Sequence, residues 1–311
     1  MARYRHALPQ LNGGSFLTDG GLETTLVFLE GIDLPCFAAF PLAISDQGRA
    51  TLERYFAPYL RTARDRGVGF VLDTPTWRAN ADWGAKLGYS REDLVRVQQA
   101  SVALACDLRQ RHGSQAQPVV VNGVVGPRGD GYRADLLMTA AEAQDYHSDQ
   151  IGVFSGTEAD MVSAITMNYA EEAIGIAHAA RAAGLPVAIS FTVETDGKLP
   201  TGEELGAAIT RTDAETASAP AYYMINCAHP THFDTVLSGG AWQQRIRGIR
   251  ANASTQSHAE LDAATALDSG DPADLGRRYK ELRTRLHGAC VLGGCCGTDL
   301  RHIEAICEAC F

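Results

Sequence analysis

Eight short apolar runs recur along the chain, and most of them are followed by a longer segment with helical periodicity. Runs that are apolar almost throughout are typical of strands buried on both faces of a parallel sheet. Eight strands alternating with helices favour a closed (β/α)8 TIM barrel over an open sheet. The expected strands are residues 15–18, 68–73, 118–125, 159–166, 186–193, 221–226, 246–251 and 289–293, and the expected helices are residues 50–66, 91–112, 140–156, 170–183, 203–217, 232–237, 272–287 and 298–310.

The chain length of 311 residues fits one such barrel. No linker, low-complexity run or block of like charge divides the sequence, so we expect a single domain over residues 1–311. The first unit departs from the plain pattern. Residues 20–50 form an insertion punctuated by Gly and Pro, which predicts a short helix and a loop over the barrel mouth.

The charge balance indicates the class of partner. The sequence has 27 Lys and Arg against 37 Asp and Glu, for a formal net charge of -10. This acidity argues against nucleic acid or an anionic membrane surface as the main partner and favours a small-molecule substrate. No apolar stretch approaches the roughly 18 residues of a membrane span, and residues 1–14 lack the apolar core of a secretory signal. With eight cysteines and no export signal, we predict a cytoplasmic protein with reduced thiols.

Three cysteines stand at the ends of predicted strands. Cys227 follows the sixth apolar run, and Cys295 and Cys296 follow the eighth. TIM barrels carry their chemistry at the carboxyl ends of the strands, where these thiols would converge. Three thiolates fit a tetrahedral Zn²⁺ with one open position, and the flanking Gly294 and Gly297 allow adjacent cysteines to reach one ion. The alternative is that the three are buried, inert cysteines.

An all-thiolate zinc site favours one kind of reaction. Three thiolates on Zn²⁺ leave a formal charge of -1, which makes the metal a weak Lewis acid for hydrolysis. Such a site is suited to binding a fourth thiol as a nucleophilic thiolate. The ligand set therefore predicts alkylation of a thiol substrate.

Three motifs carry a resemblance to a known family. They are Asp-Gly-Gly at residues 19–21, Asn-Cys-Ala-His-Pro at 226–230 and Gly-Gly-Cys-Cys-Gly-Thr at 293–298. Together they resemble the zinc-dependent homocysteine S-methyltransferases, from about residue 16 to residue 306. The resemblance implies that Cys227, Cys295 and Cys296 hold Zn²⁺ and that the substrate thiol completes the tetrahedron. It also implies methyl transfer from a sulfonium or ammonium donor to homocysteine, which forms methionine, or to a related thiol.

The sequence departs from the family at one important position. Family members end the fourth strand in Phe-Glu-Thr, and that Glu helps to bind the homocysteine ammonium. Here Ile165 occupies the matching place, and the second strand ends in Asp73 where the family has Asn. Either Asp73 replaces the missing carboxylate or the acceptor is not homocysteine, although Asp73 could also cap a loop. The candidate substrate-binding residues are Asp19, Gly20, Gly21, Asp73, Thr74 and Asn226.

Two other functions stay open from the sequence: a zinc-dependent hydrolase or lyase on the same barrel, and a non-catalytic zinc or thiol sensor. The methyl donor and the oligomeric state are also open. No cobalamin or folate domain is recognisable, which favours a free small-molecule donor, and a cationic donor would be attracted to aromatic faces. Cys307 and Cys310 are expected to be packing or surface cysteines. The aromatic residues expected on mouth loops are Trp77, Trp83, Tyr89 and Tyr132.

Overall fold

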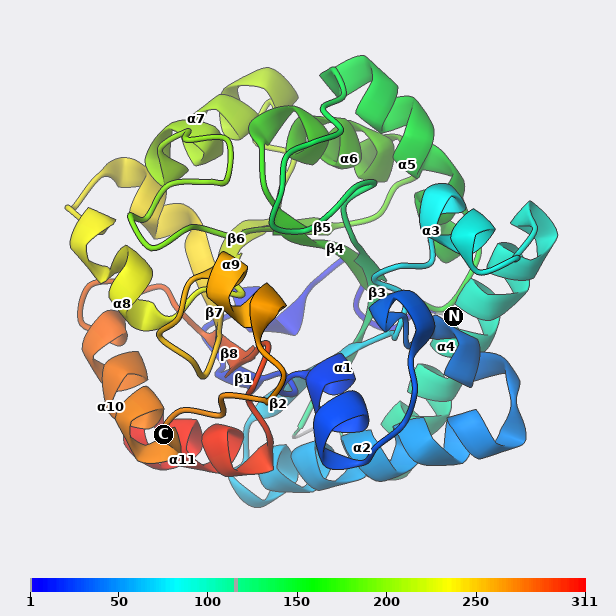
Figure 1. The fold of residues 1–311 in the computed structure, drawn as a ribbon, viewed down its shortest axis with the longest axis horizontal. Helices are drawn as coiled ribbons and strands as arrows, with labels where there is room; N and C mark the ends of the chain where they lie inside the picture. The colour runs from blue at the N-terminus through cyan, green and yellow to red at the C-terminus, as the bar shows by residue number, and fades with distance from the viewer. Residues whose placement is uncertain (1, 115–116) are drawn as a thin grey trace.

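The computed structural model describes residues 2–114 and 117–311. The predicted domain also covers Met1 and residues 115–116, which lie outside the described residues. Eight parallel strands follow one another around a closed barrel, and β8 pairs with β1 (Figure 1). This confirms the predicted fold class and all eight predicted strands. Their bounds are β1 Phe16–Leu17, β2 Gly69–Asp73, β3 Val119–Val125, β4 Met161–Met167, β5 Val187–Phe191, β6 Tyr222–Asn226, β7 Ile246–Ala251 and β8 Val291–Gly294.

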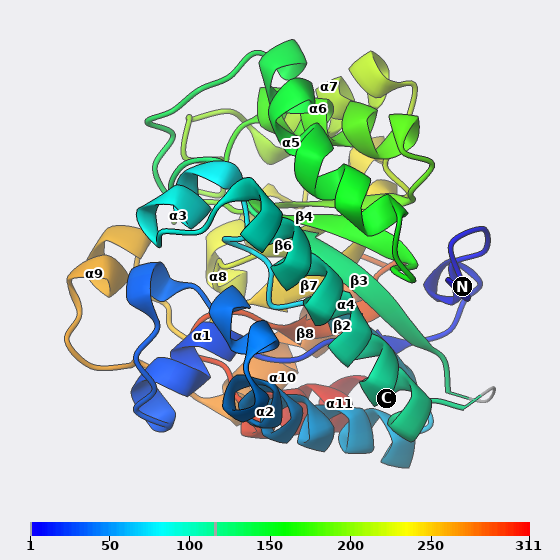
Figure 2. The ribbon, with the colours of Figure 1, turned by 90° about the vertical axis from the view of Figure 1, so that its right-hand side faces the viewer.

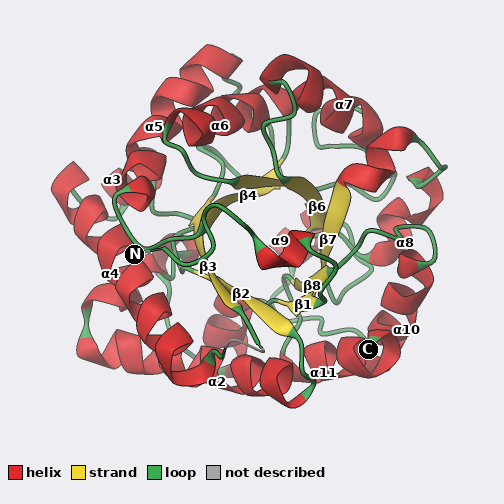
Figure 3. Ribbon diagram, turned by 180° about the vertical axis from the view of Figure 1, so that it is seen from behind, coloured by secondary structure: helices red, strands yellow, loops and turns green. Residues whose placement is uncertain are grey.

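Helices form a ring around the barrel (Figure 3). The ring contains α2 Asp46–Asp65, α4 Arg91–His112, α5 Ala140–Ser155, α6 Ala170–Ala182, α7 Leu205–Thr216, α8 Pro230–Phe233, α10 Pro272–Arg283 and α11 Leu300–Cys310. The helix expected at residues 232–237 begins earlier, because the His229 side chain caps it by accepting from the Thr231 amide. No helix in the described part of the chain combines the length and apolarity that crossing a bilayer requires.

Three further helices lie at the barrel mouth. The short α1 (Leu22–Thr24) lies in the predicted insertion, whereas α3 (Ala81–Lys86) and α9 (His258–Ala263) were not predicted. In Figure 1, α9 lies over the centre of the barrel, and Figure 2 shows α1, α3 and α9 at the end opposite the N-terminus. Ser257 and Glu260 form a capping box that starts α9.

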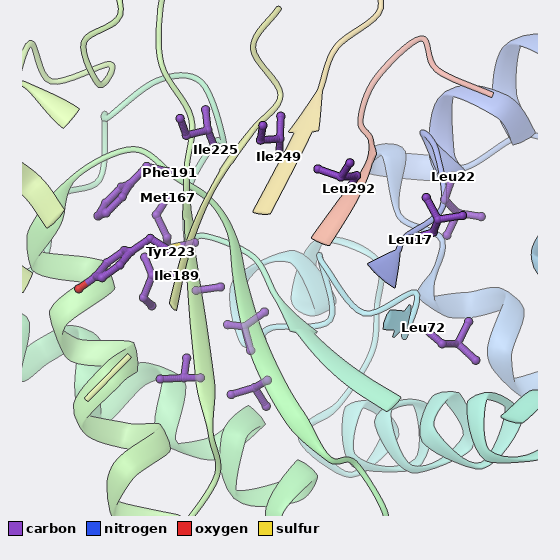
Figure 4. Close-up of a cluster of buried hydrophobic side chains, with 14 of the residues drawn as sticks. Leu17, Leu22, Leu72, Met167, Ile189, Phe191, Tyr223, Ile225, Ile249 and Leu292 are labelled. Carbon is purple, nitrogen blue, oxygen red and sulfur yellow. The ribbon is translucent and has the colours of Figure 1, made fainter. Parts of the chain in front are cut away.

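Alternation along the strands produces two apolar layers. One set of strand side chains packs between the sheet and the helices, and Figure 4 shows labelled members from β1, β2 and β4–β8. The other set fills the barrel interior and includes Phe16, Val71, Val120, Met161 and Tyr222. Because this interior layer is packed, the barrel is a solid support for the loops at its mouth and not a channel.

The N-terminal segment is anchored at the opposite end of the barrel. The backbone amides of Arg3 and Tyr4 donate to Asp160 Oδ1 at 2.7 and 2.8 Å. Buried Arg109 donates to the other oxygen of Asp160 at 2.9 Å. Burial of this ion pair requires the extra hydrogen bonds that the segment supplies. The chain therefore covers the end of the barrel that lies away from the predicted thiols.

Candidate active site

A cavity of about 410 Å³ opens at the carboxyl ends of the strands. Its walls come from the strand ends, from α1 and from the segment containing α9. The three predicted cysteines, Cys227, Cys295 and Cys296, all line it. A concave site at this face of a TIM barrel is where substrates bind.

The sulfur atoms of Cys227, Cys295 and Cys296 lie within 4.8 Å of one another. Cys227 directly follows β6 in a left-handed conformation, with φ of 53°, which non-glycine residues rarely adopt. Such a conformation at a site is kept only where the surrounding structure enforces it. In the structure Cys227 and Cys295 form a disulfide, with Cα atoms 5.3 Å apart, and Cys296 is a free thiol.

The three cysteines fit a zinc ion once the disulfide is reduced. Zinc–sulfur bonds of about 2.3 Å in a tetrahedron place sulfur atoms about 3.8 Å apart, so reduction must let Cys227 and Cys295 separate while the three sulfurs keep within the observed 4.8 Å. Thiolates are preferred ligands for zinc. The three residues supply three of four positions, so the fourth is left for a ligand from the cavity.

An aromatic pair, Tyr132 on the loop after β3 and His258 at the start of α9, lies beside the thiols. The Tyr132 hydroxyl lies 3.5 Å from Cys296 Sγ, and the Tyr132 ring stacks on His258 with centroids 4.1 Å apart. His258 in turn contacts Glu194 Oε1 at 2.9 Å and the carbonyl of Cys227. Burial raises the pKa of Cys296 to about 11, and the Tyr132 hydrogen bond opposes this rise by favouring the thiolate.

The Asp-Gly-Gly motif packs against the thiol loop. A Cβ atom at Gly20 would lie 2.7 Å from the carbonyl oxygen of Thr298, and one at Gly21 would lie 2.6 Å from that of Cys295. Only glycine permits this approach. The predicted substrate-binding glycines therefore place the end of β1 directly beside the metal-ligand loop.

Thr74 and Asn226 are both buried and hydrogen-bonded to neighbouring strand ends. Thr74 Oγ1 accepts from the Val124 amide at 3.0 Å. Asn226 Oδ1 accepts from Ser190 Oγ at 2.6 Å and from the Thr166 amide at 3.0 Å, and its amide nitrogen lies 4.0 Å from Cys295 Sγ. Their contacts hold the strand ends in place, and substrate contact by either residue stays a prediction.

Arg250, at the end of β7, lies between the two predicted carboxylates. Its Nη2 donates to Asp19 Oδ1 at 2.8 Å, its Nη1 donates to Asp73 Oδ2, and its Nε donates to the carbonyl of Gly294 at 3.3 Å. The remaining oxygens accept from Tyr55 at 3.1 Å and from Asn122 at 2.7 Å. All four carboxylate oxygens therefore have donors within the protein. These contacts argue against Asp73 as a free replacement for the family Glu.

Burial and the neighbouring charges of Arg250 and Asp73 affect the protonation of Asp19. Burial raises the pKa of Asp19 to about 7, with the Arg250 charge opposing the shift and the Asp73 charge adding to it. Two carboxylates beside a single cation leave an excess negative charge in a buried site. Asp19 therefore takes up a proton near neutral pH.

Ile165 lines the same cavity and is only 8 % exposed. Its carbonyl accepts from Trp77 Nε1 at 3.1 Å, so the loop after β2 covers the place of the missing carboxylate. Of the aromatic residues predicted on mouth loops, Trp77 and Tyr132 line the cavity. Tyr89 instead packs against Phe40, with ring centroids 5.0 Å apart. Cys307 is buried and Cys310 half-buried in α11, as expected for packing cysteines.

Sequence reasoning missed Arg250, Glu23 and His258. Arg247 and Arg250 both interrupt the seventh apolar run, and a charged residue in such a run signals buried pairing, but only the structure shows that Arg250 is the buried one. His258 follows the Ser257 cap of α9, whose Ser-x-x-Glu pattern was readable. Glu23 follows the Asp-Gly-Gly motif by two residues, with no local pattern that marks it as a cavity residue.

Known proteins resemble the chain over nearly its whole length. The homocysteine S-methyltransferase family profile matches residues 16–310. Homocysteine S-methyltransferase 4 of Zea mays is 24% identical over 332 residues, covering 96% of this chain and 90% of the relative. The homocysteine methyltransferase MmuM of Escherichia coli has the same fold. Its oxidized form has a TM-score of 0.75 at 20% identity with 94% of each chain covered, and its metallated form has 0.73 at 19% identity with 97% of this chain and 98% of that one covered. This chain is an S-methyltransferase and belongs to the homocysteine S-methyltransferase family.

Proposed function

We propose that this protein is a zinc-dependent, cytoplasmic homocysteine S-methyltransferase whose donor is a small sulfonium or quaternary ammonium compound. The observation that carries the proposal is the cluster of Cys227, Cys295 and Cys296, with sulfur atoms within 4.8 Å of one another on the wall of a 410 Å³ cavity. The Zea mays relative and MmuM, both homocysteine methyltransferases by name, support homocysteine as the acceptor.

The charge of the cavity supports a cationic donor. Six carboxyl side chains and two guanidinium groups line it, so its field is negative even before the thiolates are counted. Aromatic faces on the wall would attract a methylated cation. The carboxyl groups are Asp19, Glu23, Asp73, Asp130, Asp262 and Asp268, the guanidinium groups Arg78 and Arg250, and the aromatic residues Phe28, Phe37, Phe56, Trp77 and Tyr132.

When bound, the zinc ion would hold the acceptor sulfur as a thiolate at neutral pH. The chain then orients the two substrates. The acceptor sulfur attacks the donor methyl carbon in line, a new C–S bond forms, and the bond from carbon to the onium atom breaks. The electron pair of that bond stays on the donor, which leaves as a neutral thioether or amine. Alignment in the cavity supplies much of the acceleration, and no protein side chain needs to transfer a proton during the displacement.

The proposal is tested with zinc-loaded protein, homocysteine and three donors carrying deuterated methyl groups: S-methylmethionine, S-adenosylmethionine and glycine betaine. The expected result is deuterated methionine from at least one donor, detected by mass spectrometry. Cys296→Ser should abolish it, whereas Cys36→Ser, which alters an exposed cysteine, should not. Absence of labelled methionine with all three donors, despite bound zinc, would overturn the proposal.

A further inference from the structure

The cavity wall carries one half-buried carboxyl group and one guanidinium group that make no ion pair or hydrogen bond with any other residue that the structure describes. They are Glu23, in α1, and Arg78, on the loop after β2. Resting on the proposed function, we propose that Glu23 and Arg78 bind the amino-acid end of the acceptor thiol, with Glu23 receiving the ammonium and Arg78 the carboxylate. This pair would replace the carboxylate that the family has at the position of Ile165.

The other carboxyl groups of the cavity are either hydrogen-bonded or exposed. Asp130 accepts from the Tyr132 amide, Asp268 accepts from Ser254 Oγ and the Gly270 amide, and Asp262 is exposed. Asp19 and Asp73 use all four oxygens on Arg250, Tyr55 and Asn122. A substrate ammonium would have to displace one of these buried donors, at the cost of leaving another charge unpaired. Glu23 has no such partner, so a cationic substrate group can reach this half-buried carboxyl group without breaking a bond between residues of the protein.

Glu23 is held beside the thiol loop by the residues on both sides of it. Gly21 packs against the carbonyl of Cys295, and Thr24 Oγ1 accepts from the Gly297 amide at 3.2 Å. Burial raises the pKa of Glu23, and a cationic group bound beside it would oppose that rise by favouring the carboxylate form.

Arg78 is held by two aromatic rings. Its guanidinium carbon lies 4.5 Å from the ring centroid of Trp77 and 3.6 Å from that of Trp83. Its Nε is buried without a hydrogen-bond partner among the described residues. Trp77 also donates to the Ile165 carbonyl, so Arg78 lies on the loop that covers the place of the family carboxylate. A planar guanidinium held in this way can bind a carboxylate through two parallel hydrogen bonds.

The two charges are complementary to the head group of an α-amino acid. Both groups line the same cavity, and the charge of Arg78 opposes the rise that burial causes in the pKa of Glu23. A zwitterion with its ammonium towards Glu23 and its carboxylate towards Arg78 would neutralise both. Its thiol would then extend towards Cys296 and the other sulfurs.

Binding of three thiols to the zinc-loaded protein tests the assignment by calorimetry, without any donor. The thiols are L-homocysteine, 4-mercaptobutanoate, which lacks the amine, and 3-aminopropane-1-thiol, which lacks the carboxylate. We expect Glu23→Gln to weaken homocysteine and the aminothiol at least tenfold and the mercaptoacid less than twofold. Arg78→Met should weaken homocysteine and the mercaptoacid at least tenfold and the aminothiol less than twofold. Glu304→Gln and Arg61→Met, which alter exposed groups on α11 and α2, should change no affinity.

Each variant also reports on its own folding, because the thiol that lacks the affected group should still bind normally. Equal affinity of the wild type for all three thiols would overturn the assignment and leave the proposed methyl transfer intact. Equal weakening of all three thiols in Glu23→Gln or in Arg78→Met would also overturn it, since the residue would then act on the site as a whole. If none of the three thiols bound to the zinc-loaded wild type, both proposals would be overturned.

Discussion

Arg250 Nη2 lies 2.8 Å from Asp19 Oδ1, although 231 residues separate them in the sequence. The same guanidinium contacts Asp73, so one cation joins the ends of β1, β2 and β7. The side chains of Arg250, Asp19 and Asp73 are 9%, 4% and 10% exposed. Two carboxylates that the sequence suggested for substrate binding therefore stabilise the floor of the site.

Removing the cation should destabilise the protein strongly. Arg250→Met leaves two buried carboxyl groups without their counter-charge, and loss of one partner of a buried pair costs about 3–5 kcal/mol. Urea denaturation at pH 7 measures the free energy of unfolding. Arg277→Met is the control, because its ion pairs lie on the exposed face of α10, where solvent screens them and they contribute little to stability. A loss below 1 kcal/mol for Arg250→Met would contradict this account.

Stability should depend on pH through Asp19. Its pKa is about 7 in the folded protein and about 3.9 in an unfolded chain. Between these values the folded protein holds a proton that the unfolded chain has lost, so the free energy of unfolding falls as the pH rises and levels off above 7. Asp73→Asn removes the repulsion that helps to raise this pKa and should flatten the decline.

The measurement is urea denaturation of wild type and Asp73→Asn between pH 5 and pH 8. The difference between the two proteins isolates the site from other titrating groups. Asp145→Asn, which alters an exposed carboxylate on α5, should keep the wild-type profile. Identical slopes for wild type and Asp73→Asn would contradict a contribution of the Asp73 charge to the raised pKa of Asp19.

The zinc assignment predicts a dependence on three cysteines only. Cys227→Ser, Cys295→Ser and Cys296→Ser should each lower zinc content severalfold, because a serine hydroxyl is a far weaker ligand than a thiolate. Mass-spectrometric metal analysis of purified protein measures this, with Cys36→Ser as the matched control. Full zinc occupancy in Cys296→Ser would remove that residue from the ligand set.

Oxidation should remove the metal and join two of its ligands. Cys227 and Cys295 form a disulfide in the structure, and sulfur atoms joined in a disulfide are no longer the thiolates that bind zinc. Peroxide should release zinc and yield a peptide that links Cys227 to Cys295, and reductant plus zinc should restore activity. Loss of activity with zinc retained would place the oxidative damage elsewhere.

A carboxylate returned to the family position should compensate for the loss of Glu23. Ile165 lines the cavity on β4, so Ile165→Glu introduces an acidic group into the same space. In the Glu23→Gln background it should recover most of the lost homocysteine affinity and leave 4-mercaptobutanoate binding unchanged. Calorimetry of the single and double variants measures the recovery, and Ile165→Gln serves as the uncharged control. Equal affinities of the double variant and Glu23→Gln would argue that the ammonium lies away from β4.

The sequence by itself determined the barrel and the position of its thiols. Runs that are apolar almost throughout, alternating with helical segments, specify a parallel sheet covered by helices, and closure after eight units follows from their number. Cys227 and Cys295 come directly after the ends of strands, so their convergence at one face follows from topology alone. Short helices were harder to predict, since α3 and α9 span only six residues each and depend on caps and tertiary contacts more than on periodicity.

Only the tertiary structure decided which charges are free. Arg250, Asp19 and Asp73 meet because strand tilt and register bring three distant strand ends to one point, and no local pattern encodes that meeting. The two carboxyl groups that the sequence suggested for substrate binding, Asp19 and Asp73, are both paired with Arg250. Glu23 and Arg78 also line the cavity and are not part of this pairing. Electrostatic interactions act across space and not along the chain, so the partners of a buried charge emerge only when the barrel has closed.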